Sequence, residues 1–339
     1  MRAVMGCPTA TQHMCPAVIS RPLSSRAPGL LSSWLGTKAV PSQPRRRHFG
    51  FYTLARSKAR GRRAIATAMK SSAPLRIEII EGSQLQNRPD STNNVVLYTH
   101  MLCPYAQTAL LTLLCKGVPH QVVHIDLSQK PAWFTQLCHH EGFAATVPVI
   151  DCNGKAQTES IDICRWVCDN FQAPEFPMLT FSSPQDKNQI DLLIQQRPGF
   201  VSAGMDLLAG ATGRHWQIGT KQSQQQWEAF EQHLTVFQDA IKRSGGPYLM
   251  GSEVSLADLL YFPFMERFAL SMPEFTGFDP CDACDGIMSD WLEAMGHLTC
   301  CQLASADDKL FQQALRQERS LDFFDYSTYT AYQLHPHLQ

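Results

Sequence analysis

Apolar residues recur along the chain at two different spacings, which predict a region of alternating strands and helices. Val95-Val96-Leu97-Tyr98-Thr99 is a compact β-branched run of the kind found in buried strands. After Cys103-Pro104, apolar residues follow one helix face and stop at Lys116-Gly117, a normal helix end. The same spacings then predict a strand at 120–126, a helix at 130–142, a strand at 147–150, a short strand after Asn153-Gly154, and a helix at 159–171.

This order of elements is the thioredoxin-like layout, so we expect an α/β thioredoxin-like N-terminal domain at 94–172. Residues 69–93 form a lead-in with at most a short strand at 77–80, and three prolines mark a linker at 173–187. Helical spacing with almost no strand pattern predicts an all-α helical C-terminal domain at 188–304. Its clearest helices are 222–243, one starting at the near capping box Ser255-Leu256-Ala257-Asp258, and one around 290–295.

Composition excludes several classes of protein. The chain has 339 residues, of which 44% are hydrophobic and 17% charged. It therefore has ample material for buried cores and too few charges for a disordered tail protein. Its apolar runs fall short of the roughly 18 residues that a membrane span needs, so we expect no stable membrane insertion.

Charge divides the chain into two unlike parts. Fourteen of the 29 Lys and Arg residues precede Glu78, the first acidic residue, so residues 77–339 carry a net charge of about −15. The Arg-rich, acid-free start is also rich in Ser, Ala and Pro, which is the composition of a transit peptide, and we place one at 1–68. This composition favours the chloroplast over the mitochondrion; a basic nucleic-acid-binding arm around Arg45-Arg46-Arg47 is the alternative. The tail at 305–339 has no clear period.

The acidic remainder argues against nucleic acid as a partner. In an organelle-targeted chain, twelve cysteines indicate reduced thiols rather than a disulfide framework. The spacing of Cys281, Cys284, Cys300 and Cys301 superficially fits a zinc site, but adjacent cysteines rarely bind one ion. We therefore expect inert thiols or a redox-active pair there. Cys138-His139-His140 is read as a helix end rather than a metal site.

Cys103 is the strongest candidate for chemistry. A thiol at the start of a helix faces free backbone N–H groups, which should lower its pKa and favour the nucleophilic thiolate. Dithiol redox proteins place a second cysteine three residues later, where this chain has Ala106. The pattern therefore favours single-thiol chemistry that needs an external thiol such as glutathione. A buried structural cysteine is the alternative.

Two further pairs complete the candidate site. Val147-Pro148 precedes the third strand, where thioredoxin-like proteins carry a cis proline whose neighbouring backbone can pair with an extended peptide. Glu159-Ser160 opens a helix, where free N–H groups and a carboxylate can hold the two charged ends of a γ-glutamyl group. Taken alone, the first pair is equally a common strand start and the second an ordinary helix cap.

Between about residues 77 and 300, the chain resembles the glutathione transferase superfamily, and most closely its cysteine-dependent lambda and omega classes. The resemblance is carried by Cys103-Pro104-Tyr105-Ala106, Lys130-Pro131-Ala132-Trp133-Phe134, Val147-Pro148, Glu159-Ser160, and the stretches Gly246–Leu249, Ser255–Asp258 and Pro263–Phe268.

The resemblance implies a role for each matching residue. Cys103 would form a mixed disulfide with glutathione, the co-substrate, and no metal would be needed. Lys130 would reach the glycyl carboxylate and Val147 the cysteinyl unit, while Glu159 and Ser160 would hold the γ-glutamyl end. The stretch 138–146 is longer than in relatives, so the register at Lys130 is open. An acceptor pocket between the domains would be lined by Tyr105, Phe200 and Trp216.

The implied activity is thiol transfer from small-molecule or protein glutathione adducts. A dehydroascorbate reductase is the first alternative, although such enzymes resemble Cys-Pro-Phe-Ser where this chain has Ala106. A non-catalytic protein that binds hydrophobic ligands, and a relative of the chloride intracellular channels, are the others. The resemblance leaves a monomer and a homodimer open.

Overall fold

The computed structural model describes residues 77–172, 178–181, 183–212 and 219–305, with the single positions 312 and 316. The predicted transit peptide, the start of the lead-in, Trp216 and nearly all of the 305–339 tail lie outside these residues. None of the helices in this part of the chain combines the length and the apolarity that crossing a bilayer requires.

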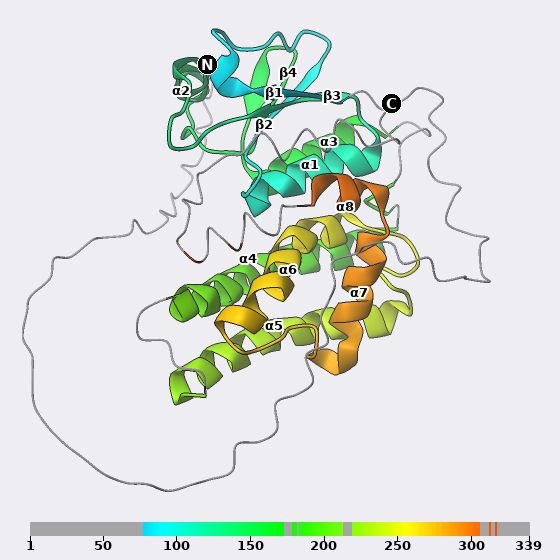
Figure 1. The fold of residues 1–339 in the computed structure, drawn as a ribbon. Coiled ribbons are helices and arrows are strands. Elements are labelled where there is room, and N and C mark those ends of the chain that lie inside the picture. Colours follow the sequence, from blue (N-terminus) through cyan, green and yellow to red (C-terminus); the bar gives the residue numbers. More distant parts are fainter. Residues whose placement is uncertain are drawn as a thin grey trace, which may run out of the picture. The chain divides into compact units, whose positions relative to one another are not determined.

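The first domain is built on a mixed sheet of the strands β1 (Ile77–Glu81), β2 (Val95–Thr99), β3 (His120–His124), β4 (Val149–Cys152) and β5 (Lys155–Gln157). Their spatial order is β1-β3-β2-β4-β5 (Figure 1). Strands β1, β3 and β2 run parallel, whereas β4 is antiparallel to β2 and β5 to β4. Central β2 is buried along its whole length, which explains its continuous apolar run.

Helices cover both faces of this sheet (Figure 1). On one face lie α1 (Pro104–Lys116) and α3 (Ser160–Asn170), and on the other lies α2 (Ala132–Glu141). Val95 and Leu97 of β2 belong to the hydrophobic cluster of α1 and α3, whereas Val96 and Tyr98 pack in the cluster of α2. Successive side chains of β2 thus point to opposite faces of the sheet and pack against the helices on each face. The predicted thioredoxin-like layout is confirmed.

The sheet begins earlier than the predicted domain boundary at residue 94. Strand β1 forms its edge, paired along β3. Between β1 and β2, Arg88 and Ser91 both donate to the carboxylate of Asp151 on β4, through Arg88 Nε at 2.7 Å and Ser91 Oγ at 2.8 Å. Because the side chain of Asp151 is fully buried, these partners satisfy a charge that could not otherwise stay in the interior. The stretch predicted as a lead-in therefore completes the domain.

The second domain is helical, as predicted, and comprises α4 (Pro184–Thr212), α5 (Lys221–Ser244), α6 (Leu256–Phe275), α7 (Ile287–Gly296) and α8 (Thr299–Ala304). Phe200 of α4 lies at its centre. The ring centroids of four aromatic side chains lie 5.1–5.7 Å from that of Phe200, and these are Phe230, Phe237, Tyr261 and Phe268. Such ring clusters contribute both buried area and edge-to-face attraction.

Helix α4 starts inside the predicted linker of 173–187, which is a correction. Pro184, taken as a linker residue, is its first residue. Proline suits that position because its fixed φ matches the helix and its missing N–H would have no partner there. Ser183 caps the start by accepting a hydrogen bond from the backbone N–H of Asp186 at 3.1 Å.

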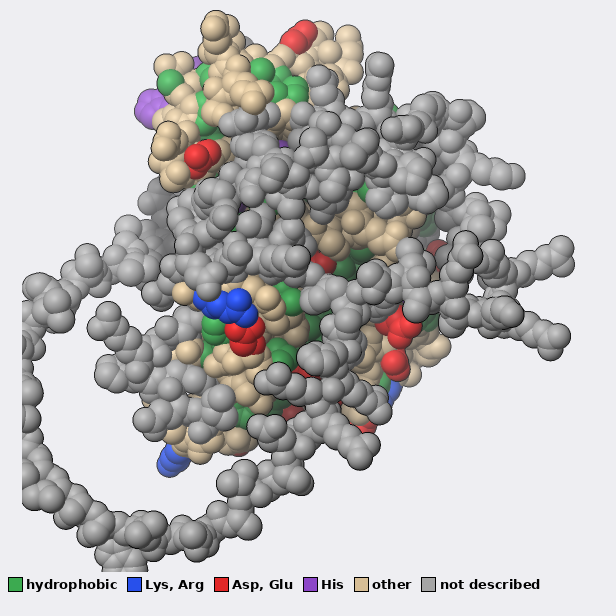
Figure 2. All heavy atoms as spheres, viewed as in Figure 1, with side chains coloured by type: hydrophobic (Ala, Val, Ile, Leu, Met, Phe, Trp, Pro, Cys, Tyr) green, Lys and Arg blue, Asp and Glu red, His purple; other side chains and the backbone are tan. Residues whose placement is uncertain are grey.

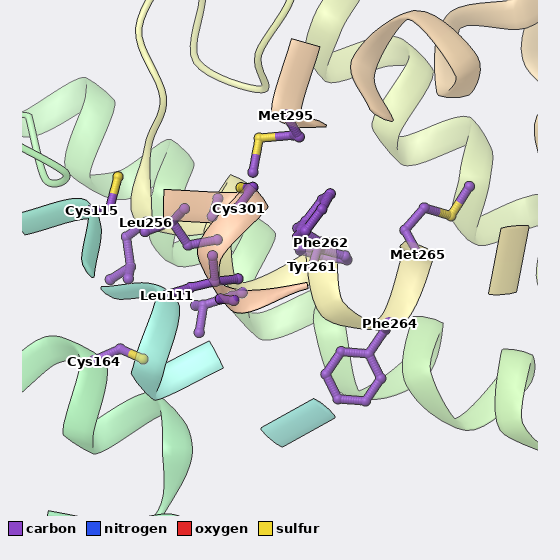
Figure 3. Close-up of a cluster of buried hydrophobic side chains, with 14 of the residues drawn as sticks. Leu111, Cys115, Cys164, Leu256, Tyr261, Phe262, Phe264, Met265, Met295 and Cys301 are labelled. Carbon is purple, nitrogen blue, oxygen red and sulfur yellow. The ribbon is translucent and has the colours of Figure 1, made fainter. Parts of the chain in front are cut away.

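The two domains share one hydrophobic cluster. Helix α1 packs against α6 and α8 as well as against α3. Figure 3 shows Leu111 and Cys115 of α1 beside Leu256 of α6 and Cys301 of α8. On the face that Figure 2 shows, acidic side chains lie at several separate places, and Lys or Arg side chains lie at only a few.

Asp258 anchors the start of α6. The predicted near capping box is a full one, because Ser255 accepts from the Asp258 N–H and Asp258 accepts from the Ser255 N–H. The same buried carboxylate also accepts from the backbone N–H of Leu249 at 2.9 Å and from the indole of Trp291 at 2.8 Å. One side chain thus joins the start of α6 to the preceding loop and to α7.

Replacing this carboxylate should destabilise the protein strongly. Asp258→Ala leaves several buried donors without a partner, which should lower the free energy of unfolding by about 3–5 kcal/mol. Urea unfolding followed by far-UV circular dichroism measures the effect. Asp239→Ala on the exposed side of α5 is the control and should change little. Equal midpoints for the two variants would contradict this account of the cap.

Candidate functional site

Cys103 lies between β2 and α1, at the residue that caps the helix. Its backbone is extended, with φ −83° and ψ 111°, and Pro104 is the first helical residue. The N–H of Cys103 donates to the carbonyl of His100 at 3.0 Å, while its own carbonyl accepts from the N–H of Gln107 at 3.0 Å. These bonds place a half-buried thiol at the start of α1, the position expected from the sequence.

Val147 and Pro148 lie beside this thiol. The peptide bond between them is cis. The Sγ atom of Cys103 is 3.9 Å from the carbonyl oxygen of Val147, to which the thiol donates. Residues 44 positions apart are therefore adjacent, as the predicted pairing of reactive cysteine and cis proline requires.

The start of α3 is tied to the same loop. The hydroxyl of Thr158 donates to the carbonyl of Pro148 at 3.1 Å. Glu159 follows with φ +70°, a region that costs a non-glycine residue about 1–3 kcal/mol and is often found at functional sites. Its side chain is exposed and makes no capping bond, while Ser160 is buried as the first residue of α3. The free N–H groups of this helix start are thus not covered by the cap residue's side chain.

Burial raises the pKa of the Cys103 thiol above its ordinary value, which corrects the expected lowering. Removal of the sulfur from water is the largest effect, because burial penalises the charged thiolate. The backbone N–H of Ala106, the charge of Arg267 and the backbone N–H of Tyr105 act in the opposite direction on this pKa. The helix start stabilises the thiolate as expected, but burial outweighs it.

The remaining predicted residues lie in different surroundings. Lys130 is exposed in the loop before α2, and within the described residues no hydrogen bond or ion pair joins it to the site around Cys103. Tyr105 is 43% exposed and packs edge-on against Phe264 of α6, with 4.9 Å between the ring centroids. Phe200 is 1% exposed within the aromatic cluster, so it is a core residue and not a pocket residue. Trp216 lies outside the described residues.

Two side chains near the site were not predicted. Thr158 joins the cis proline loop to α3, and its only sequence signal is a hydroxyl residue just before a helix start. Arg267 is a charged residue in the largely apolar helix α6, and its guanidinium reaches the start of α1. A buried charge in an apolar helix is a signal for function or pairing, but the sequence does not say what it contacts.

Cysteines other than Cys103 lie at several places in the described part of the chain. The ten cysteines in the described part of the chain are all free thiols. Cys300 of α8 contacts Cys115 of α1 and Cys301, while Cys281 and Cys284 lie before α7. Across 77–172, 178–181, 183–212 and 219–305, no cluster of three or more His, Cys, Asp and Glu side chains could hold a metal ion. His139 and His140 are exposed in the last turn of α2.

Comparison with known proteins gives matches in both domains. The family model of the glutathione S-transferase N-terminal domain matches residues 102–170, and that of the C-terminal domain matches residues 220–298. Glutathione S-transferase L1 of Arabidopsis thaliana is 30% identical over 180 residues, which are 52% of this chain and 68% of that protein. Glutathione S-transferase L2, chloroplastic, of the same plant is 27% identical over 212 residues, covering 60% of this chain and 66% of the relative.

Solved structures agree on the fold. Glutathione transferase Omega 3C from Trametes versicolor superposes with a TM-score of 0.56 and 24% sequence identity, over 68% of this chain and 93% of that one. The matches to the curated relatives span about two thirds of their length. The predicted pairing of an α/β thioredoxin-like domain with an all-α domain is therefore confirmed.

The raised pKa of Cys103 predicts a specific pH dependence. Because the thiolate is the reactive form, the rate of alkylation of Cys103 by iodoacetamide should keep rising through pH 9.0, the ordinary cysteine value, without a plateau below it. Samples quenched at successive times and analysed by peptide mass spectrometry give this rate for Cys103 separately from the other cysteines. A plateau already at neutral pH would contradict the effect of burial.

Proposed function

Because this chain belongs to the glutathione S-transferase family, we propose that it is a glutathione-dependent thiol transferase of lambda or omega type with Cys103 as nucleophile. The observation that carries the proposal is the thiol at the start of α1, 3.9 Å from the Val147 carbonyl next to a cis proline. The position one turn later is Ala106, so the chain has no thiol where dithiol redox proteins carry their second cysteine. This arrangement favours a mixed disulfide with an external thiol.

The residues around Cys103 suit the parts of glutathione. The carbonyl of Val147 faces the thiol, which supports the proposal that the backbone of Val147 would pair with the cysteinyl unit of the tripeptide. The start of α3 offers backbone N–H groups to the γ-glutamyl carboxylate, and Ser160 lies at its first position. The exposed carboxylate of Glu159 would hold the γ-glutamyl ammonium group. Lys130 would contact the glycyl carboxylate from the loop before α2.

The reaction proceeds by two disulfide exchanges. The Cys103 thiolate attacks the glutathione sulfur of a mixed disulfide, forms the Cys103–glutathione bond and releases the substrate thiolate, which takes up a proton. A second glutathione thiolate then attacks the glutathione sulfur on Cys103. This step releases oxidised glutathione and restores the Cys103 thiolate, so one free glutathione is consumed for each substrate thiol released, and the other half of the oxidised glutathione comes from the substrate adduct. The acceptors would be small hydrophobic or protein adducts of glutathione that enter beside Tyr105.

The cellular site would be the chloroplast. Two observations support this location: the Arg-rich, acid-free segment at 1–68, and the name of a relative, glutathione S-transferase L2, chloroplastic.

Exposure of the full chain to oxidised glutathione tests the nucleophile. Intact-protein mass spectrometry should find one added glutathione on the parent and none on Cys103→Ser, because serine cannot form the disulfide. Deglutathionylation of a model mixed disulfide should be lost in the same variant.

Cys284→Ser is the matched control, since Cys284 is also half-buried but lies in the helical domain. It should be labelled like the parent. Equal labelling of parent and Cys103→Ser would refute Cys103 as the nucleophile. Absence of label on both would favour a non-catalytic protein that binds hydrophobic ligands.

Replacement of Glu159 tests the proposed γ-glutamyl contact. Glu159→Gln keeps the size of the side chain but removes the charge that would pair with the ammonium group. The KM for glutathione should rise about tenfold with kcat nearly unchanged, which is a loss of about 1.4 kcal/mol in binding. Glu253→Gln, another exposed glutamate, is the control and should leave KM unchanged. An unchanged KM in Glu159→Gln would remove Glu159 from the binding site.

A further inference from the structure

An arginine of the helical domain contacts the start of α1. Arg267 lies on α6, and its Nη2 donates to the carbonyl of Leu102 at 3.4 Å, one residue before Cys103. Its Nη1 donates to the side-chain oxygen of Gln107 on α1, and to the carbonyl of Pro263 on α6 at 2.7 Å. One guanidinium thus bridges α6 to both the residue before the reactive cysteine and the first turn after it.

This guanidinium is buried, and Glu266 is the carboxylate beside it among the described residues. Arg267 is 3% exposed, and the nearest carboxylate oxygen of Glu266 lies 3.9 Å from its Nη1. The amide of Gln107 stands between them, since its nitrogen donates to Glu266 at 3.0 Å while its oxygen accepts from Arg267. The amide of Gln107 therefore links Arg267 to Glu266, while the same guanidinium donates to the carbonyl of the residue before Cys103.

We propose that Arg267 is a positioning residue for the thiol-transfer reaction: it fixes the start of α1 and stabilises the Cys103 thiolate from the other domain. The inference rests on the proposed function of Cys103. In support, the charge of Arg267 lowers the pKa of Cys103 and so opposes the effect of burial. The reactivity of the Cys103 thiol in the first domain then depends on a cation of the helical domain.

Among the described residues, the groups that the structure places beside Cys103 differ from Arg267 in charge or in what they contact. The ring of His100 accepts from the backbone N–H of Leu102 at 3.3 Å, and the Val147 carbonyl faces the thiol. Glu266 is negative and would disfavour a thiolate. A second buried guanidinium at the interface, Arg197 of α4, donates to the carbonyl of Leu260 and lies over the rings of Tyr105 and Phe264. It is a matched residue of equal burial that faces aromatic rings instead of the Cys103 loop.

The pH profile of Cys103 alkylation by iodoacetamide in the full chain tests the inference. Arg267→Gln should slow alkylation near neutral pH about tenfold, by moving the apparent pKa up by about one unit. Arg267→Lys keeps the charge and should stay within about twofold of the parent. Arg197→Gln should keep the parental profile, although it also removes a buried arginine from the interface. Circular dichroism and thermal unfolding establish that each variant is folded.

Equal alkylation of folded Arg267→Gln and Arg267→Lys would overturn the inference, because the charge would then have no effect. If Arg267→Gln does not fold, the alkylation rate of Glu266→Gln tests the charge effect instead. It removes the carboxylate that shares Gln107 with Arg267 and should accelerate alkylation about twofold, while an unchanged or slower rate refutes the charge effect.

Iodoacetamide needs no glutathione site, so this result is separate from the proposed function. The protein could show alkylation of Cys103 that depends on Arg267 and yet take up no glutathione. That result would refute the proposed thiol transfer and leave the inference about Arg267 standing.

Discussion

Helix α1 is buried on every side, and the arrangement of both domains depends on that burial. All residues from Ala106 to Lys116 lie in the interior, with the sheet and α3 on one side and α6 and α8 on the other. The hydroxyls of Thr108 and Thr112 are tolerated there because each donates to a carbonyl one turn earlier in the same helix. The first turn of α1, and with it Cys103, is therefore held by both domains.

The same burial sets the chemistry of the thiol. The free N–H groups of a helix start favour a thiolate when the sulfur lies close to them. In this protein, the same position also removes the Cys103 sulfur from water, which disfavours the thiolate. Two opposed effects of one location thus decide the pKa. A charge from a distant part of the chain shifts this balance toward the thiolate without reversing it, and Arg267 has this effect although it lies 164 positions from Cys103 in sequence.

Local sequence patterns were sufficient to predict an element when all the residues that determine it lie in one short segment. The strand Val95–Thr99 and the helix starts at Pro104 and at Ser255 follow from residue types at close spacing, whereas the cis bond before Pro148 was expected from its place in a thioredoxin-like domain. They failed where a residue's role depends on its neighbours in space. Phe200 could have lined a pocket by its type, but four rings surround it. Pro184 could have belonged to a linker, but it starts a helix.

The sequence by itself determined the order of strands and helices, the division into an α/β and a helical domain, and the candidate thiol at the start of a helix, because hydrophobic spacing and capping are local properties. Only the tertiary structure decided that α1 is buried on both sides, that Arg88 and Ser91 bond to Asp151, and that Arg267 reaches Leu102. These contacts join residues about 60 to 165 positions apart. Burial and long-range charge arise only when distant segments meet, so no local pattern encodes the pKa of Cys103.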